Sequence, residues 1–148
     1  MIAEITPECL DEAISLVNRV FEEFVAVDYS EVGRKTFAYS DDMAKALACG
    51  EKKLWGFFDG EKIVGVIGIR NGSHIALLFV DKAFQHQGIA KKLFMTAVAY
   101  VRNQSAAEKI TVNSSPYAVP VYEKLGFSKT SESLEKDGII FTPMEFWI

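Results

Sequence analysis

The sequence predicts an α+β domain built around a central mixed sheet of about six to seven strands, flanked by about four helices. Three observations lead to this prediction. A helical apolar pattern occupies the N-terminal region. The middle contains three strand-like segments joined by Asp59-Gly60 and Asn71-Gly72, dipeptides that favour tight type I′ hairpins. The expected elements follow the order β-α-α-β-β-β-α-β-α-β-β, which is typical of helices packed on one mixed sheet.

The N-terminal region begins with a short alternating strand, Ile2–Ile5, followed by two helices. Thr6 can cap the first helix and Pro7 suits its first position. A second, less regular helix is expected over Glu31–Cys49, and Gly50 stands where a helix C-terminus favours positive φ. The first helix should bury one apolar stripe: Leu10, Ala13, Ile14, Val17, Phe21 and Phe24.

Three strands and a long helix make up the middle of the chain. The helix is expected over Gly88–Asn103, and a short strand, Lys109–Val112, follows it. The three strands are expected at Lys53–Phe58, Lys62–Arg70 and Ser73–Val80. The inward face of the helix should carry Ile89, Leu93, Phe94, Ala97, Val98 and Val101.

The C-terminal part should contain a short helix and two strands. Ser115 can cap the helix, with Pro116 at its first position, Pro120 as a local conflict inside it and Gly126 just past its end. The strands are expected at Phe127–Thr130 and Ile139–Phe146, with Asp137-Gly138 as the turn before the second. Pro143 predicts that the last strand is an edge strand or is bulged.

Composition narrows the class of protein. The 148 residues suit a single domain, 1–148, and are 49% hydrophobic and 24% charged, as in ordinary globular proteins. The net charge of −4 argues against a nucleic-acid partner, since phosphate binding usually requires a basic face. The sequence has neither a signal-peptide pattern nor an apolar run long enough to span a membrane, so we expect a cytoplasmic protein.

The two cysteines, Cys9 and Cys49, do not suggest metal binding. They form no Cys-x-x-Cys pair, and no Cys/His cluster has zinc spacing. We therefore expect reduced, at least half-buried thiols and no metal site.

The most informative stretch is the strand–loop–helix segment from Val80 to Lys92. The first amides of a helix lack intrahelical partners and carry partial positive charge, so this helix start could bind a pyrophosphate. Gly88 and Ala90 leave room for phosphate oxygens near the backbone, and Lys91 and Lys92 add charge. The alternative is that Gly88 only eases the turn.

Two motifs in this order resemble the GCN5-related N-acetyltransferases, the GNAT family. The family's acetyl-coenzyme A loop, Gln/Arg-x-x-Gly-x-Gly/Ala, matches Gln85-His86-Gln87-Gly88-Ile89-Ala90. Its Tyr-Glu-x-Leu-Gly-Phe signature matches Tyr122–Phe127. The strong resemblance covers Ser73–Thr130, and it implies a small single-domain member of the bacterial type with the GNAT acyl-coenzyme A N-acyltransferase fold.

The resemblance also implies how acetyl-coenzyme A would bind. The pantetheine arm would lie between the strand ending near Val80 and the strand ending near Asn113, bonded to the backbone of Leu78, Phe79 and Val80. The amides from His86 to Lys91 would hold the pyrophosphate. Where the family often has a pantetheine-binding asparagine, this chain has Ser115, with Asn113 two residues earlier. Either residue could make that contact, and Ser115 could instead serve only as a helix cap.

Acetyl transfer requires a neutral amine, a polarised thioester carbonyl and a stabilised leaving thiolate. The resemblance assigns carbonyl polarisation to a backbone amide near Phe79 or Val80, and the general acid to Tyr122. A free phenol titrates near ~10 and a thiol near ~8.5, so full proton transfer would be uphill by about 2 kcal/mol. Tyr122 would therefore act mainly as a hydrogen-bond donor, unless its pKa is lowered or its role is only packing.

His74 is the candidate base. N-terminal acetylating relatives carry a glutamate where this chain has Ile110, so that base is absent. His74 lies eleven residues before Gln85, where histone-type relatives have a glutamate and arylalkylamine-type relatives a histidine. An imidazole titrating near ~6.5 suits the task, although His74 could equally have no chemical role. A set of residues could border the acceptor or form only a solvated face: Glu22, Glu23, Asp28, Tyr29 and Glu31.

These observations predict an acetyltransferase that uses direct attack within a ternary complex, because no cysteine lies in either motif to carry the acetyl group. The acceptor would be an amine on a small molecule, peptide or protein, and the family resemblance allows a homodimer. The main alternative is a non-catalytic acyl-coenzyme A sensor. A structural interaction domain that leaves the loop unused is the third reading.

Overall fold

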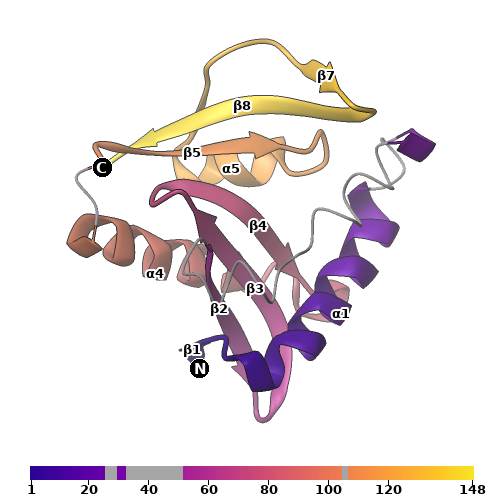
Figure 1. Cartoon of the computed structure of the whole chain (residues 1–148), viewed down its shortest axis with the longest axis vertical. Coiled ribbons are helices and arrows are strands. Elements are labelled where there is room, and N and C mark those ends of the chain that lie inside the picture. Colours follow the sequence, from indigo (N-terminus) through magenta and orange to yellow (C-terminus); the bar gives the residue numbers. More distant parts are fainter. Residues whose placement is uncertain (26–29, 33–51, 105–106) are drawn as a thin grey trace.

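The computed structural model of the chain describes residues 1–25, 30–32, 52–104 and 107–148 (Figure 1). Of the expected second helix, only Glu31 and Val32 are described, and both are helical. The rest of that helix, with Gly50, lies outside the described residues.

A mixed sheet forms the centre of the fold, as predicted. Its order is β1-β2-β3-β4-β5-β8-β6, and β7 pairs with β8. Among the described strands, the β4–β5 pairing alone is parallel and the others are antiparallel. The strands are β1 (Ile2–Glu4), β2 (Lys52–Asp59), β3 (Lys62–Arg70), β4 (His74–Val80), β5 (Lys109–Ser114), β6 (Ser128–Lys129), β7 (Leu134–Lys136) and β8 (Ile139–Trp147).

Two helices pack on opposite faces of the strands β3 and β4 (Figure 1). The first is α1 (Leu10–Val20), with a 3-10 turn η1 (Pro7–Cys9) before it and a π-helical turn η2 (Phe21–Val25) after it. The second is α4 (Ile89–Gln104), whose six predicted inward residues are all buried. Of the predicted α1 stripe, Ile14 and Phe24 are only partly buried, while the other four residues are core.

The parallel strands β4 and β5 stay together for only a short distance. They pair at His74–Thr111 and Ile75–Val112 and nowhere further along β4. The register between β3 and β4 also shifts at this point, so that Ala76 is the extra residue of a β-bulge. Beyond this bulge β4 and β5 diverge. We call the region between residues 76–80 of β4 and residues 113–114 of β5 the strand gap.

The turns differ from the predicted type I′ hairpins. Between β2 and β3 the two loop residues are Gly60 and Glu61, and only Gly60 has positive φ, whereas a type I′ turn requires it at both. The β3–β4 loop has positive φ at Asn71 and Gly72 but spans three residues. The type I′ pattern occurs instead at Asp137 (φ 53°) and Gly138 (φ 78°), which join β8 to β7, a strand the sequence did not predict.

Helix α5 (Val119–Leu125) begins later than predicted. Ser115 caps the preceding turn rather than the helix, since its Oγ accepts a hydrogen bond from the Ala118 amide (3.2 Å). Pro120 therefore lies in the first helical turn, where a missing amide is tolerated, and the expected conflict does not arise. Gly126 ends the helix with φ 108°, as predicted.

The prediction for Pro143 was wrong. Strand β8 is an interior strand with β5 on one side and β6 and β7 on the other, and its register with β5 is regular. On the second side Pro143 lies between the residues paired with β7 and those paired with β6. Its carbonyl accepts a hydrogen bond from the Thr130 amide (2.9 Å). A proline is tolerated here because the neighbouring strand is interrupted at that point.

Candidate functional site

The loop after β4 is anchored by Asp81. Its carboxylate accepts hydrogen bonds from the Ala83 amide (3.0 Å) and from Nη2 of Arg19 on α1 (2.7 Å). The Ala83 amide and the Arg19 guanidinium hold the pKa of Asp81 below its usual range, against the opposing effect of partial burial. A short 3-10 helix, η4 (Lys82–Phe84), follows, so the entry into the loop is fixed to both β4 and α1.

The predicted phosphate loop has the backbone shape that exposes a helix start. His86 (φ 64°) and Gly88 (φ 80°) both have left-handed conformations, and α4 begins at Ile89. A Cβ added at Gly88 would meet no atom within 4 Å, so its positive φ, not crowding, favours glycine here. The first amides of α4 follow directly after Gly88, and such helix-start amides stabilise an anion. Lys91 is exposed, while the Lys92 ammonium lies 5.8 Å from the Phe57 ring centroid.

Backbone groups of β4 point alternately toward β3 and toward the strand gap. The Asp81 amide donates to the Val64 carbonyl of β3 (2.8 Å). Because the backbone groups of successive strand residues point to alternate sides, the N–H and C=O of Phe79 also point toward β3. Those of Leu78 and Val80 point toward the gap. This alternation favours Val80 over Phe79 as the amide that could polarise a carbonyl.

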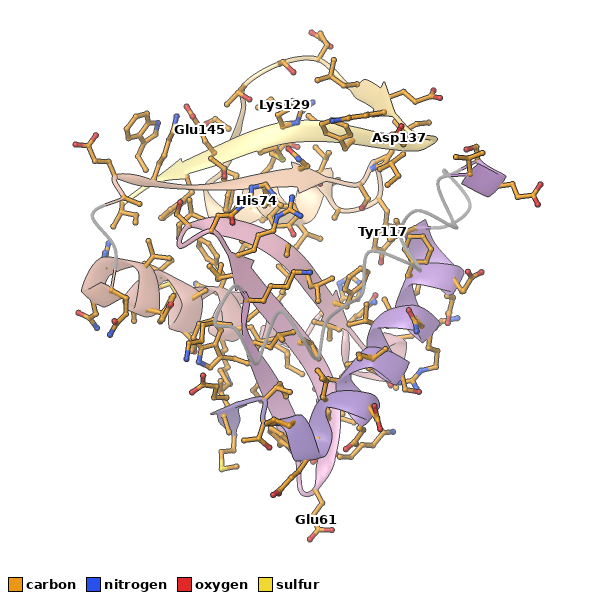
Figure 2. All side chains as sticks on the ribbon, in the orientation of Figure 1. Glu61, His74, Tyr117, Lys129, Asp137 and Glu145 are labelled. Atoms are coloured by element: carbon orange, nitrogen blue, oxygen red, sulfur yellow. The ribbon has the colours of Figure 1, made fainter. Side chains whose placement is uncertain are left out.

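A side-chain bridge crosses the open end of the strand gap. Gln85 Nε2 donates to the Val80 carbonyl (3.0 Å), and the Tyr117 hydroxyl donates to Gln85 Oε1 (3.2 Å). The Tyr117 ring stacks on Phe24 at a centroid distance of 4.9 Å. Figure 2 shows Tyr117 near the end of α1. Tyr117 therefore joins the β5–α5 connection to both η2 and the loop.

Sequence reasoning missed Tyr117, and the only available signal was an aromatic residue five positions before Tyr122. Tyr117 is 42% exposed, and nothing in its local sequence indicates its partners on other elements.

Tyr122 is a buried phenol on α5. It is only 5% exposed and belongs to the core cluster that includes Ile75, Val80 and Val112 from the two strands beside the gap. Burial raises the pKa of Tyr122 above its ordinary value. Within the described part of the chain, no hydrogen bond involves its hydroxyl, and its ring packs edge-on against Phe127 (5.3 Å). The phenol therefore stays protonated and can donate a hydrogen bond to an incoming group.

His74 lies at the closed end of the strand gap, half-buried between the β3–β4 hairpin and β5 (Figure 2). Its Nδ1 is 2.8 Å from Thr111 Oγ1. Burial, and secondarily the positive charge of Arg70, lowers the pKa of His74 to about 4. The prediction that the His74 imidazole has a pKa near ~6.5 was therefore wrong for this site. His74 is neutral at pH 7, and its Nε2 can accept a proton only when Nδ1 carries the hydrogen donated to Thr111.

The remaining predicted residues have simpler surroundings. Asn113 is exposed, opposite Pro143 in the sheet register. Of the acidic set, Glu23 pairs with Lys82 (3.1 Å), Glu22 and Glu31 are exposed, and residues 28 and 29 lie outside the described residues. Among the described residues, no group of three or more histidine, cysteine, aspartate or glutamate side chains is arranged to hold a metal ion. No described helix is long and apolar enough to cross a membrane.

A splayed pair of parallel strands, with a helix start at its open end and a buried phenol beside it, defines the N-acyltransferase class of fold. The chain belongs to the GNAT acetyltransferase family, because the family model described as "Acetyltransferase (GNAT) domain" matches residues 25–147.

Curated human relatives match part of the chain. N-acetyltransferase 8 from Homo sapiens is 34% identical over 93 residues, covering 54% of this chain and 40% of that protein. Human N-acetyltransferase 8B is 33% identical over 91 residues with the same coverage. The matched region thus spans about 40% of the length of these relatives.

Solved structures share the fold. A GCN5-related N-acetyltransferase from Rhodopseudomonas palustris superposes with a TM-score of 0.83 at 18% identity, covering 100% of this chain and 95% of that one. The PaiA N-acetyltransferase of Thermoplasma acidophilum, solved in complex with coenzyme A, superposes with a TM-score of 0.78 at 16% identity, covering 100% and 98%. At such identities the likeness concerns the fold alone.

Proposed function

We propose that this chain is an N-acetyltransferase that takes the acetyl group from acetyl-coenzyme A and passes it to a primary amine. The observation that carries the proposal is the strand gap, which lies between the Gly88 loop and His74. In this gap the backbone groups of Leu78 and Val80 that point away from β3 have no partner in β5. An extended pantetheine arm fits such an edge, since it can bond to the backbone as an added strand would. Family membership and the coenzyme A bound to a structural neighbour support the same donor.

The residues present suit each part of this donor. The amides of the Gly88 loop and the first turn of α4 would hold the pyrophosphate, including those of His86, Gln87, Ile89, Ala90 and Lys91. The Asn113 side chain is exposed beside the gap and could contact the arm, whereas Ser115 already uses its hydroxyl to cap a turn. A gap-facing amide of β4 would polarise the thioester carbonyl, and the Tyr122 hydroxyl would donate to the leaving sulfur.

Direct attack then needs the following proton balance. The neutral amine attacks the carbonyl carbon and the carbon–sulfur bond breaks. The amine nitrogen loses one proton, and the released thiolate takes up one proton from water. Tyr122 stabilises the thiolate by hydrogen bonding, because its raised pKa makes full proton transfer unfavourable. His74, with a pKa of about 4, is a weak base and would pass the amine proton on to water rather than retain it.

A glutamate at Gly88 tests the proposal. Gly88→Glu should lose coenzyme A binding in calorimetry while remaining folded, because the carboxylate would occupy the anion's place. The left-handed conformation costs an L-residue about 1–2 kcal/mol. Gly60→Glu is a matched control, since Gly60 has φ 63° and equally open surroundings. Wild-type affinity in Gly88→Glu would refute the loop assignment.

A non-catalytic acyl-coenzyme A sensor is the second candidate. It is favoured by one observation: the pKa of Tyr122 is raised and that of His74 is lowered, so neither group exchanges protons readily near pH 7. Thiol release across a panel of amines separates the two functions. Coenzyme binding without thiol release from any amine would favour the sensor.

A further inference from the structure

A row of polar side chains crosses the sheet at the closed end of the strand gap. In the strand register Arg70 of β3 lies opposite His74 of β4, His74 lies beside Thr111 of β5, and Thr111 lies opposite Glu145 of β8. Residues paired in this way project from the same face of a sheet. The hydrogen bond between His74 and Thr111 confirms the shared face for the central pair.

This face is the one against which α1 packs. Ile75, the neighbour of His74, belongs to the core cluster with α4, so His74 projects to the opposite side. On that opposite side the core cluster of α1 includes Val66 of β3 and Leu77 of β4. The row therefore lies on the side of the sheet away from α4, at the closed end of the strand gap.

The two ends of the row differ in charge and in pairing. At one end the Glu145 carboxylate is already bound by Lys109 Nζ (3.0 Å) and by Trp147 Nε1 (3.2 Å). At the other end Arg70 is exposed and forms no ion pair with any residue that the structure describes. Lys52 of β2 lies opposite Arg70 in the strand register.

The Arg70 guanidinium, which pairs with no acid among the described residues, limits which acceptors can bind beside His74. It repels an ammonium group, so a substrate whose only charge is cationic is disfavoured there. It attracts a carboxylate, which the planar guanidinium can bind through two parallel hydrogen bonds. Directly opposed side chains have Cβ atoms about 5 Å apart, so an amine at His74 and a carboxylate at Arg70 would be separated by only a few bonds.

We propose that Arg70 binds a carboxylate of the acceptor, and that the acceptor is therefore an amine with a carboxylate a few bonds away, as in an amino acid. This inference rests on the proposed acetyltransferase function and adds the substrate class. Arg70 acts as a specificity-determining residue, while His74 faces the amine.

The test compares matched acceptors. Wild-type protein and acetyl-coenzyme A are assayed for thiol release with a panel of free amino acids, the methyl ester of each, and the corresponding decarboxylated amines. The free amino acids should give a higher kcat/KM than their methyl esters and the decarboxylated amines. Arg70→Gln should lower kcat/KM about 10- to 100-fold for the carboxylates, chiefly through KM, and little for the esters. Arg70→Lys should restore part of the preference, and Arg102→Gln on α4 should change nothing.

Two results would overturn the proposal. One is a preference for esters or decarboxylated amines in the wild type, and the other is an equal loss for acids and esters in Arg70→Gln. If no member of the panel is acetylated, the carboxylate class is also rejected. Calorimetry with coenzyme A and the Gly88→Glu variant would still decide the proposed function independently.

Discussion

Tyr122 combines deep burial with a hydroxyl that no described residue engages. Its raised pKa means that the phenol contributes a hydrogen bond rather than a free proton. Tyr122→Phe should therefore lower kcat about 10- to 100-fold, since a hydrogen bond to a charged group is lost only in the transition state. Coenzyme A affinity, measured by calorimetry, and thermal stability should stay close to wild type, because the ring and its packing against Phe127 remain. An unchanged kcat would remove Tyr122 from the mechanism.

His74 should make the folded state sensitive to acid. Its pKa is about 4 when folded and about 6.5 when unfolded, so between these values the unfolded chain binds more protons. The free energy of unfolding should therefore fall as pH is lowered from 6.5 to 4, by at most about 3 kcal/mol from this residue. Urea unfolding across that range should show the loss.

Two variants separate His74 from other acid-sensitive groups. His74→Gln should flatten the dependence between pH 6.5 and 4, and His86→Asn, at an exposed histidine, should leave it intact. Asp81 has a depressed pKa, so its contribution is lost below its ordinary value of 3.8 and lies outside the window. The same slope in His74→Gln would show that the imidazole is not desolvated.

At the scale of elements, the side-chain bridge across the strand gap depends on three separate segments. Tyr117→Ala should weaken coenzyme A binding several-fold and speed its dissociation, because the bridge would close over the pantetheine arm. Adenosine 3′-phosphate 5′-diphosphate, which lacks that arm, should bind Tyr117→Ala as it binds wild type. Tyr117→Phe keeps the stack on Phe24 but loses the bond to Gln85, and should give an intermediate effect. Equal weakening of both ligands would place the role of Tyr117 in the phosphate loop instead.

Local signals predicted the elements, and long-range contacts decided the details of the site. The inward face of α4 and the loop at Gly88 were predictable because a 3.6-residue period and a positive-φ glycine are properties of a short stretch. The bulge at Ala76 was not, since register depends on the partner strand. The desolvation of His74 and the partners of Tyr117 also come from residues distant in sequence, so no local pattern could reveal them.

At the scale of the whole molecule, two parts of the sheet meet at only two residue pairs. Strands β1 to β4 form one part and β5 to β8 the other, joined at His74–Thr111 and Ile75–Val112. The core cluster that includes Tyr122 and α4 also spans both parts. A ligand that bonds to β4 within the strand gap would add backbone hydrogen bonds at the least connected region of the sheet.

Hydrogen exchange can test that arrangement. Coenzyme A should slow exchange at the gap-facing amides of Leu78 and Val80 and in the Gly88 loop, because these amides would gain acceptors. Amides of residues 55–57 in β2, where that strand is paired with both β1 and β3, should change little under native conditions. At about 100 times its dissociation constant the ligand should also raise the free energy of unfolding by about 2.7 kcal/mol. Protection confined to the loop, with Leu78 and Val80 unchanged, would mean that the ligand binds by its phosphates alone and does not enter the sheet.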